Sequence, residues 1–299
     1  MRLSPLLLAC LAATWLIWGS TYLAIKFALD SFPPFYQMGS RFLIAGALLF
    51  AWQWSRGRPL PTAREWRSAA IIGTLLLVSG MGFTAYAELT VASGLVVAYI
   101  AIIPLLVTAI NLPFGLRPTR LELVGMLVGF AGVLMLIRGE AFTASPIGLG
   151  AITVACLSWS LGSVLSQRRF RLAPGAMGFA SEMLCGSVLL LVLSTLVGER
   201  PEWPPQTMAA GAWLYLIVFG SLLAFNAYMV LLGSVSAALA SSYTFVNPVI
   251  ALGLGIWLGG ETVTPFEWLA AGVITLGVVL LVLGRQAGAA HGSTPRSRD

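Results

Sequence analysis

Long apolar stretches separated by short polar segments dominate the pattern of this chain. The stretches lie at residues 5–28, 33–54, 68–89, 92–114, 121–137, 147–167, 177–197, 208–231, 237–258 and 266–284. A helix needs about 20 mainly apolar residues to cross the hydrocarbon core of a bilayer. The pattern therefore predicts an all-α integral membrane protein with ten transmembrane helices. The first stretch continues to Leu29, too far for a cleaved signal peptide, so we expect it to be retained.

The two halves of the chain carry the same order of residues at nearly the same spacing. Each has a small-residue segment, then a tyrosine, a proline and, in the next stretch, a glycine. The matching positions are ASGL at 92–95, Tyr99, Pro104 and Gly132, and SAAL at 236–239, Tyr243, Pro248 and Gly277. With five spans in each half, the second copy must enter the membrane from the opposite side. We predict two inverted five-helix repeats at 1–140 and 141–284, an arrangement typical of transporters, and a disordered cytoplasmic tail at 285–299.

Composition and charge strengthen the membrane interpretation. The chain is 58% hydrophobic and 9% charged, whereas a soluble domain has roughly a quarter of its residues charged. The net charge of +6 comes from short basic clusters between apolar spans, which indicates loop orientation and not nucleic-acid binding. One set of loops holds thirteen basic residues, at positions 2, 56, 58, 64, 67, 117, 120, 168, 169, 171, 285, 296 and 298. The positive-inside rule therefore predicts that both termini are cytoplasmic.

Several classes of chemistry lack the residues they need. Cys10, Cys156 and Cys185 lie inside apolar segments without metal-ligand spacing, and the one histidine, His291, lies in the tail. The one lysine, Lys26, is not part of a phosphate-binding loop. We therefore predict that the chain is not an enzyme and that it uses no metal or cofactor.

Four charged residues in or near the spans are candidates for gating or coupling, because such groups are costly in lipid. Arg41, in the middle of the second span, either ties helices together or holds a substrate or gating carboxylate. Glu182, near the start of the seventh span, either reaches water at the cytoplasmic end, which its position favours, or relays protons. Lys26 and Glu88 lie near external span ends, where they either snorkel to water or pair as an external gate.

Amides, prolines and aromatic rings supply the candidate substrate site. Pro104 and Pro248 are expected to kink the fourth and ninth spans at matching depths, either as simple shape or beside a cavity. Asparagine amides either satisfy backbone carbonyls near such kinks or bind a zwitterion. Deep tryptophans and tyrosines either belong to interfacial belts or line a cavity. The predicted substrate-binding residues are Trp15, Trp18, Tyr22, Tyr86, Tyr99, Trp159, Asn226, Tyr243 and Asn247.

The fifth span has a different composition from the others. It carries Gly125, Gly129 and Gly132 in an otherwise apolar segment, and small residues at this spacing favour close helix packing. We expect the fifth and tenth spans to form peripheral scaffolding or a dimer surface.

Taken in order, these residues resemble EamA-type members of the drug/metabolite transporter superfamily over residues 5–284. The positions that carry the resemblance are Trp18-Gly19-Ser20, Arg41, Ala92-Ser93 through Pro104, Ser236-Ala237-Ala238 through Pro248, and Gly260-Glu261. The resemblance implies ten helices in inverted halves and export of small metabolites across the bacterial inner membrane. Within the superfamily the chain resembles YddG-type aromatic amino-acid exporters. It departs from the pattern after the fourth span, where Gly115-Leu116-Arg117 replaces Gly-Glu, so the resemblance does not extend to a paired-acid coupling mechanism.

The expected function is secondary transport by alternating access, with aromatic and aliphatic amino acids as substrates and the lipid bilayer as the surroundings. A first alternative is efflux of lipophilic cations or drugs, which favours an acid facing the cavity. A second alternative, from another class of protein, is a non-transporting membrane receptor or assembly subunit.

Overall fold

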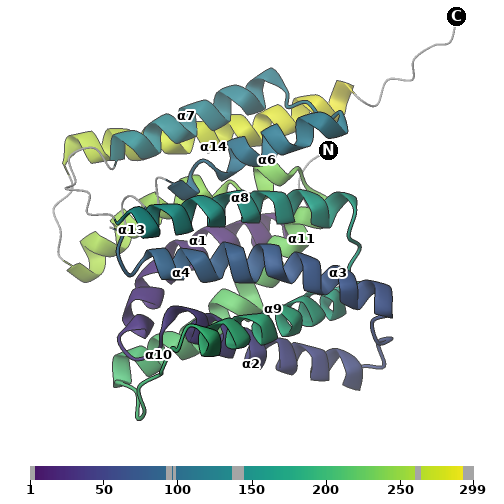
Figure 1. Ribbon diagram of the computed structural model, residues 1–299. Coiled ribbons are helices and arrows are strands. Elements are labelled where there is room, and N and C mark those ends of the chain that lie inside the picture. The colour runs from purple at the N-terminus through teal and green to yellow at the C-terminus, as the bar shows by residue number, and fades with distance from the viewer. Residues whose placement is uncertain (1–3, 92–95, 97–98, 137–144, 260–263, 292–299) are drawn as a thin grey trace, which may run out of the picture.

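The computed structural model describes residues 4–91, 96, 99–136, 145–259 and 264–291. Within these ranges the chain is helical and forms no strand. Six helical segments there are long and apolar enough to cross a membrane, namely Pro5–Leu29, Ala63–Ala87, Pro146–Arg168, Ala176–Leu196, Thr207–Ser234 and Pro265–Gly284. The predicted all-α membrane fold is thus confirmed (Figure 1).

The helices follow one another with short connections. Their bounds are α1 Pro5–Leu29, α2 Pro34–Ser55, α3 Ala63–Gly73, η1 Thr74–Gly82, α4 Phe83–Ala87, α6 Ile103–Asn111, η2 Leu112–Phe114, α7 Arg120–Leu136, α8 Pro146–Arg168, α9 Ala176–Leu196, α10 Thr207–Tyr215, η3 Leu216–Phe225, α11 Asn226–Ser234, α12 Ala237–Ala240, α13 Tyr243–Gly259 and α14 Pro265–His291. The ninth predicted span, 237–258, is divided into α12 and α13, and two helix ends differ by several residues from the prediction. The third span starts earlier, at Ala63, because Thr62 and Glu65 form a capping box there. The last helix continues to His291, beyond the expected start of the disordered tail.

Two π-helical segments interrupt the third and eighth predicted spans. The segment η1 joins α3 to α4, and η3 joins α10 to α11, each without a break in the rod. The π-helix is rare and occurs frequently at functional sites. Apolar periodicity does not distinguish it from an α-helix, so the sequence pattern predicted ordinary spans at both places.

The two matched prolines have different surroundings. Pro248 lies inside α13, where a kink was predicted. Pro104 is instead in the first turn of α6, directly after a turn at Ala101 and Ile102. A proline fits the first turn because its missing N–H would have no partner there, so the predicted kink at Pro104 is a helix start.

Corresponding helices of the two halves begin in the same way. Ser4 and Ser145 each precede a proline and accept a hydrogen bond from the backbone of α1 and α8, at 3.3 and 3.0 Å. Reciprocal side-chain and backbone bonds also join Thr119 to Glu122 at the start of α7, and Thr264 to Glu267 at the start of α14. Two kinds of N-cap therefore fix these four helix starts: a serine before a proline for α1 and α8, and a threonine–glutamate pair for α7 and α14.

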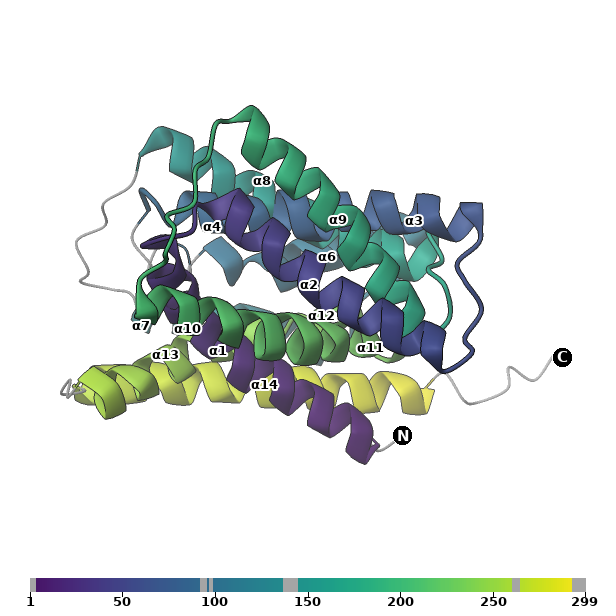
Figure 2. The ribbon, with the colours of Figure 1, turned by 90° about the horizontal axis from the view of Figure 1, so that it is seen from below.

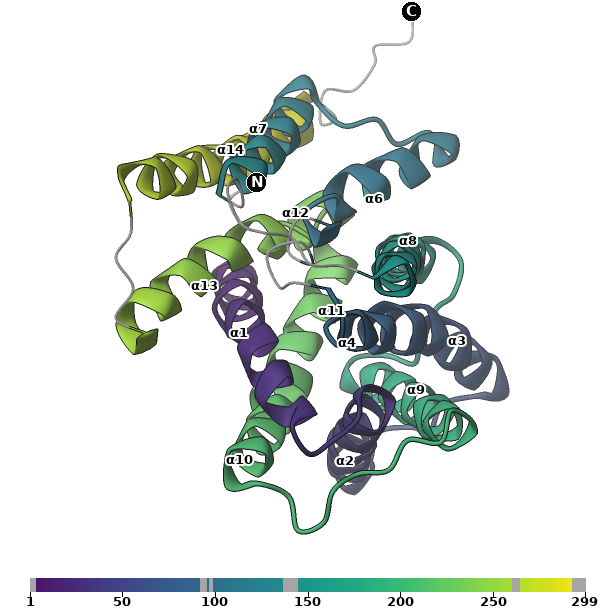
Figure 3. The ribbon, with the colours of Figure 1, turned by 60° about the vertical axis from the view of Figure 1, so that its left-hand side comes forward.

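The pair α7 and α14 packs through glycines and lies at the edge of the molecule (Figure 3). A Cβ on Gly125 would lie 2.7 Å from the backbone nitrogen of Leu281, and one on Gly132 would lie 2.8 Å from that of Ile274. The helix backbones therefore touch, as small residues allow. Large apolar side chains such as Leu127 and Leu276 remain exposed on the outer faces, in positions to contact lipid.

The remaining helices surround a central region (Figure 3). Figure 2 shows α1 beginning, and α2 and α14 ending, at the same end of the molecule. We call this end the Arg56 side, after the residue that follows α2. The opposite end, where Asp30 follows α1 and α2 begins, is called the Asp30 side.

Candidate functional site

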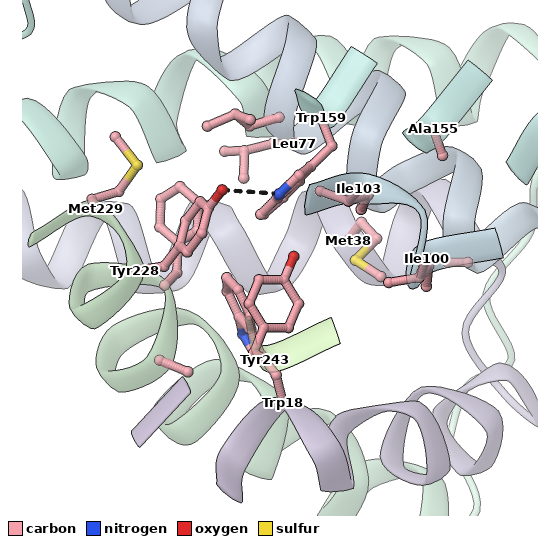
Figure 4. Close-up of a cluster of buried hydrophobic side chains, with 14 of the residues drawn as sticks. Trp18, Met38, Leu77, Ile100, Ile103, Ala155, Trp159, Tyr228, Met229 and Tyr243 are labelled. Carbon is pink, nitrogen blue, oxygen red and sulfur yellow. Dashed lines mark hydrogen bonds between the residues drawn. The ribbon is translucent and has the colours of Figure 1, made fainter. Parts of the chain in front are cut away.

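Four aromatic rings from four helices meet at the centre. Trp18 of α1, Trp159 of α8, Tyr228 of α11 and Tyr243 of α13 form what we call the aromatic cluster (Figure 4). Ring centroids are 4.5 Å apart for Trp18 and Tyr243, 5.1 Å for Trp18 and Tyr228, and 5.7 Å for Trp18 and Trp159. The rings meet edge to face or tilted, which is favourable for aromatic quadrupoles. All four side chains are buried.

Hydrogen bonds fix the rings in these positions. Trp159 Nε1 donates to Tyr228 Oη over 3.1 Å, and that hydroxyl also pairs with Ser163 Oγ over 2.7 Å. Trp18 Nε1 donates to the carbonyl of Gly220, inside η3, over 3.4 Å. Each indole therefore has a partner in spite of burial, and Tyr228 becomes the hub of the cluster.

The two indoles contact the two π-helical segments in a crossed manner. Trp18, in the first half, bonds to η3 of the second half. Trp159, in the second half, packs on Gly80 in η1 of the first half, where a Cβ would lie 2.9 Å from Trp159 Cε3. The irregular segments thus place backbone close to both rings.

A small cavity of about 60 Å³ lies beside the cluster. Its walls are apolar, with hydroxyl groups as the main polar atoms. It is lined by Trp18, Thr21, Tyr22, Ile25, Met38, Gly80, Met81, Thr84, Ile100, Ile103, Ala155, Cys156, Trp159 and Tyr243. A water needs roughly 10–15 Å³ of such space, so the cavity in this conformation holds a few waters and must widen for a larger ligand.

The cavity lies between the aromatic cluster and the Asp30 side. Ile25 and Thr84 occupy the last turns of α1 and α4, and Met38 the second turn of α2, all close to that side. Figure 4 shows Met38 and Tyr228 on opposite sides of Trp159. Trp18, Trp159 and Tyr243 therefore lie at the end of the cavity away from Met38, next to Tyr228.

Loops from both halves join above the cavity on the Asp30 side. Glu199 accepts hydrogen bonds from the backbone nitrogens of Phe35 and Tyr36, at 3.1 and 2.7 Å, and so caps α2. Ser31 Oγ donates to Glu202 over 3.3 Å, and the backbone nitrogen of Glu202 donates to the carbonyl of Ser31 over 2.8 Å. These bonds hold the loop after α9 against the corner between α1 and α2.

The predicted site residues fall into three groups. Trp18, Tyr22, Trp159 and Tyr243 line the cavity. Trp15, Tyr99 and Asn247 bond to residues in or next to the lining: Trp15 Nε1 donates to Ser242 Oγ, beside Tyr243, the backbone carbonyl of Tyr99 accepts from the Cys156 thiol, and Asn247 Nδ2 donates to Tyr22 Oη over 3.4 Å. Tyr86 and Asn226 lie elsewhere.

Tyr86 stacks on Phe35, with ring centroids 5.6 Å apart, in a second hollow on the Asp30 side. Asn226 Nδ2 donates to the carbonyl of Leu222, within its own rod, over 2.8 Å. Asn226 therefore satisfies the backbone at the end of η3, which is the structural alternative considered for an amide.

Glu88 lies close enough to Arg41 and Lys26 to interact with both electrostatically, but no hydrogen bond or salt bridge between these side chains is present in the described ranges. Lys26 is exposed, whereas Glu88 Oε1 is buried and has no hydrogen-bond partner in the described ranges. The position of Glu182 near its span end favoured access to water, and this expectation is wrong. Its side chain is 0% exposed and both carboxyl oxygens lack a partner among the described residues. The α3–η1 rod covers it, because Gly73 allows close approach.

Sequence reasoning missed Tyr228, Ser163 and Cys156 as parts of the site. Ser163 follows Trp159 by four residues, so helical spacing places both on one face of α8, and this signal was available. Cys156 was interpreted only as a small buried thiol, yet it lines the cavity. Tyr228 has no local signal, because its partners come from another helix.

A helical protein whose membrane-length helices surround a small aromatic cavity has the architecture of a membrane transporter. The model of the EamA-like transporter family matches the chain twice, over residues 3–138 and 146–283. The chain belongs to the EamA-like transporter family.

Similar proteins agree with this assignment. YedA of Escherichia coli K12, an uncharacterized inner membrane transporter, is 43% identical over 280 residues, covering 93% of this chain and 91% of YedA. YoaV of Bacillus subtilis, an uncharacterized transporter, is 29% identical and covers 81% of this chain and 85% of its own. A solved crystal structure of a protein shares the fold, with a TM-score of 0.77 at 21% identity over 93% of this chain and 97% of its own. The protein is thus a multi-pass membrane protein of a transporter family.

Proposed function

We propose that the protein exports small amphipathic metabolites, above all aromatic and aliphatic amino acids, by alternating access. The observation that carries this proposal is the cavity, which is bounded by Trp18, Trp159 and Tyr243. Threonine and tyrosine hydroxyl groups are also present in its lining. Apolar walls and rings bind an aromatic or aliphatic side chain by burial and stacking. Asn247 Oδ1, which is buried and without a partner in the described chain, is an acceptor for the ammonium group.

The crossed contacts of the two indoles support a mechanism in which the halves, 1–140 and 141–284, act as inverted repeats. Trp18 contacts η3 and Trp159 contacts η1. A movement of one half against the other therefore changes both contacts together. The family match to each half separately supports the same division. In such transporters, alternating access is largely rocking of one repeat against the other around a central site.

We assign the gates from the positions of the closures. The aromatic cluster closes the cavity toward the Arg56 side, which the charge pattern makes cytoplasmic, together with both termini. The Glu199 and Ser31 contacts close the Asp30 side, which is then periplasmic. Export requires the cluster to open first and the Asp30-side contacts to release afterwards.

Counterflow in proteoliposomes tests the proposal. Vesicles with the full-length protein, loaded with unlabelled L-phenylalanine or L-leucine, should accumulate the labelled amino acid transiently. Trp159→Ala should weaken exchange about tenfold, the equivalent of one lost aromatic contact. Trp268→Ala, which removes a tryptophan that is 61% exposed on α14, is the matched control. If no amino acid or common metabolite exchanges, the transport proposal fails and a receptor or assembly role gains support.

The cation-efflux alternative favours an acid at the cavity wall. No acidic residue is among the residues that line the cavity in the described ranges. Glu182 is nevertheless a buried acid, so Glu182→Gln gives a direct comparison. Loss of resistance to a lipophilic cation, with amino-acid exchange intact, would favour cation efflux over the proposed substrates.

A further inference from the structure

The guanidinium of Arg41 is buried at the back of the cavity wall without an oxygen partner. Its side chain is 0% exposed, and Nε and Nη1 have no hydrogen-bond partner in the part of the chain that the structure describes. Among the described residues, the one hydrogen-bond partner of Nη2 is the sulfur of Met81, at 3.9 Å, and the Cζ atom lies 4.6 Å from the ring centroid of Phe42. Both edges that bind a carboxylate with two parallel bonds, Nε–Nη2 and Nη1–Nη2, therefore lack an oxygen ligand.

An anion bound to this guanidinium would stabilise it, because burying an unpaired charge costs free energy. Glu88 is close enough to interact electrostatically with Arg41. Its Oε1 atom is also without a partner, so the charge of Arg41 is not held by a bond to that oxygen. The donors of Arg41 remain available to a ligand.

Met81 lies between the Nη2 donor of Arg41 and the cavity. Its sulfur touches Arg41, and the same side chain lines the cavity. A methionine has three rotatable bonds and readily fills different spaces. Met38, one turn before Arg41 on α2, also lines the cavity, so this face of α2 points toward it.

We propose that Arg41 binds the carboxylate of the transported molecule once Met81 turns aside. The inference rests on the proposed function and narrows its substrate class to monocarboxylates with an aromatic or aliphatic group, amino acids included. The carboxylate forms charge-assisted, bidentate bonds with Arg41, and the apolar group occupies the aromatic wall. The same positive charge disfavours amines and lipophilic cations.

The test compares ligands that share one ring and differ in charge. Counterflow is measured in proteoliposomes with L-phenylalanine, with L-phenylalaninamide, which lacks the carboxylate, and with 3-phenylpropionate, which lacks the ammonium. The wild-type protein should prefer both acids to the amide by about tenfold or more. Arg41→Gln should remove this preference, and Arg41→Lys should retain part of it, since a lysine keeps the charge but not the fork.

Two controls keep the result interpretable. Arg168→Gln removes an exposed arginine at the end of α8 and should leave the preference intact. If Arg41→Gln fails to fold, as judged by size exclusion, the wild-type ligand series and Arg41→Lys still test whether Arg41 binds the carboxylate. Equal exchange of acid and amide by the wild type, or equal losses for both in the variants, would overturn the role of Arg41. Absence of exchange with every ligand would instead overturn the proposed function.

Discussion

Trp18 and Trp159 meet edge to face, with ring centroids 5.7 Å apart and an interplanar angle of 74°. One comes from the first helix of the first half and the other from the first helix of the second half. Each also contacts a π-helical segment of the opposite half. This pair therefore joins the halves at the centre of the protein, next to the proposed binding cavity.

Cys156 provides a native probe of that cavity. In a Cys10→Ser, Cys185→Ser background, we expect its thiol to react slowly with N-ethylmaleimide, because it is 2% exposed. Saturating L-phenylalanine should slow the reaction further, since the ligand occupies the space that Cys156 lines. Mass spectrometry measures the labelling. The matched variant that retains only Cys185, which is outside the cavity lining, should show no such protection. If L-phenylalanine does not change the labelling rate of Cys156, the binding site lies elsewhere.

Tyr228 and Tyr243 form a matched pair for testing the hydrogen bonds of the cluster. Tyr228→Phe keeps the ring but leaves Trp159 Nε1 without an acceptor and Ser163 without a partner hydroxyl. We expect a loss of about 1–3 kcal/mol of stability, the usual result of a buried unsatisfied donor. Tyr243→Phe removes a hydroxyl at the cavity and should change stability much less. Thermal unfolding in detergent measures both, and equal effects would contradict the role of Tyr228 as the hub.

Gly132 tests the backbone contact between α7 and α14. An added Cβ would meet Ile274 N at 2.8 Å, so Gly132→Ala forces the helices apart and should cost about 1–3 kcal/mol. Gly272→Ala, on α14 with open space around its Cβ position, is the control and should be neutral or slightly stabilising. The comparison uses apparent melting temperatures of the purified proteins. Similar values for the two variants would mean that the helices are not packed as closely as described.

Glu199 tests the Asp30-side closure. Glu199, in the loop after α9, accepts hydrogen bonds from the first turn of α2. The residue at the N-cap position of α2 is Pro33, whose side chain makes no capping hydrogen bond. Glu199→Ala should lower stability by about 0.5–2 kcal/mol, as loss of a helix cap does. Arg200→Gln, in the neighbouring exposed position, is the control. Because the same contact forms the proposed gate, Glu199→Ala should also increase labelling of Cys156 by a reagent that enters from the Asp30 side. Unchanged labelling would remove Glu199 from the gate.

Local signals account for much of the fold. The limits of α1, α8 and α9 follow from their apolar stretches, and the Ser-Pro starts of α1 and α8 were already visible as sequence. The third apolar stretch begins at residue 68, whereas α3 begins at Ala63. The earlier start follows from Thr62 and Glu65, which have the spacing of a capping box. Capping residues therefore locate the first residue of a helix more closely than the length of the apolar stretch does.

The site was only partly predictable. The depth of aromatic residues along the predicted spans pointed to Trp18, Trp159 and Tyr243, and the structure places all three in the lining of the cavity. Glu182 was misjudged, because access to water depends on which helix covers a residue and not on its distance from the span end. Tyr86 and Asn226 have suitable chemistry but face other surroundings.

The sequence by itself determined the class of this protein: apolar stretches of membrane length, duplicated across the chain, with arginines clustered in the segments between them. These properties are encoded locally, in residues that are close together along the chain. The tertiary structure alone decided that Trp159 meets Tyr228, that η1 and η3 bring backbone to the two indoles, and that Arg41 lies behind Met81 with no oxygen partner among the described residues. The reason is physical: helical periodicity fixes which face a side chain occupies, whereas helix packing determines what that face meets.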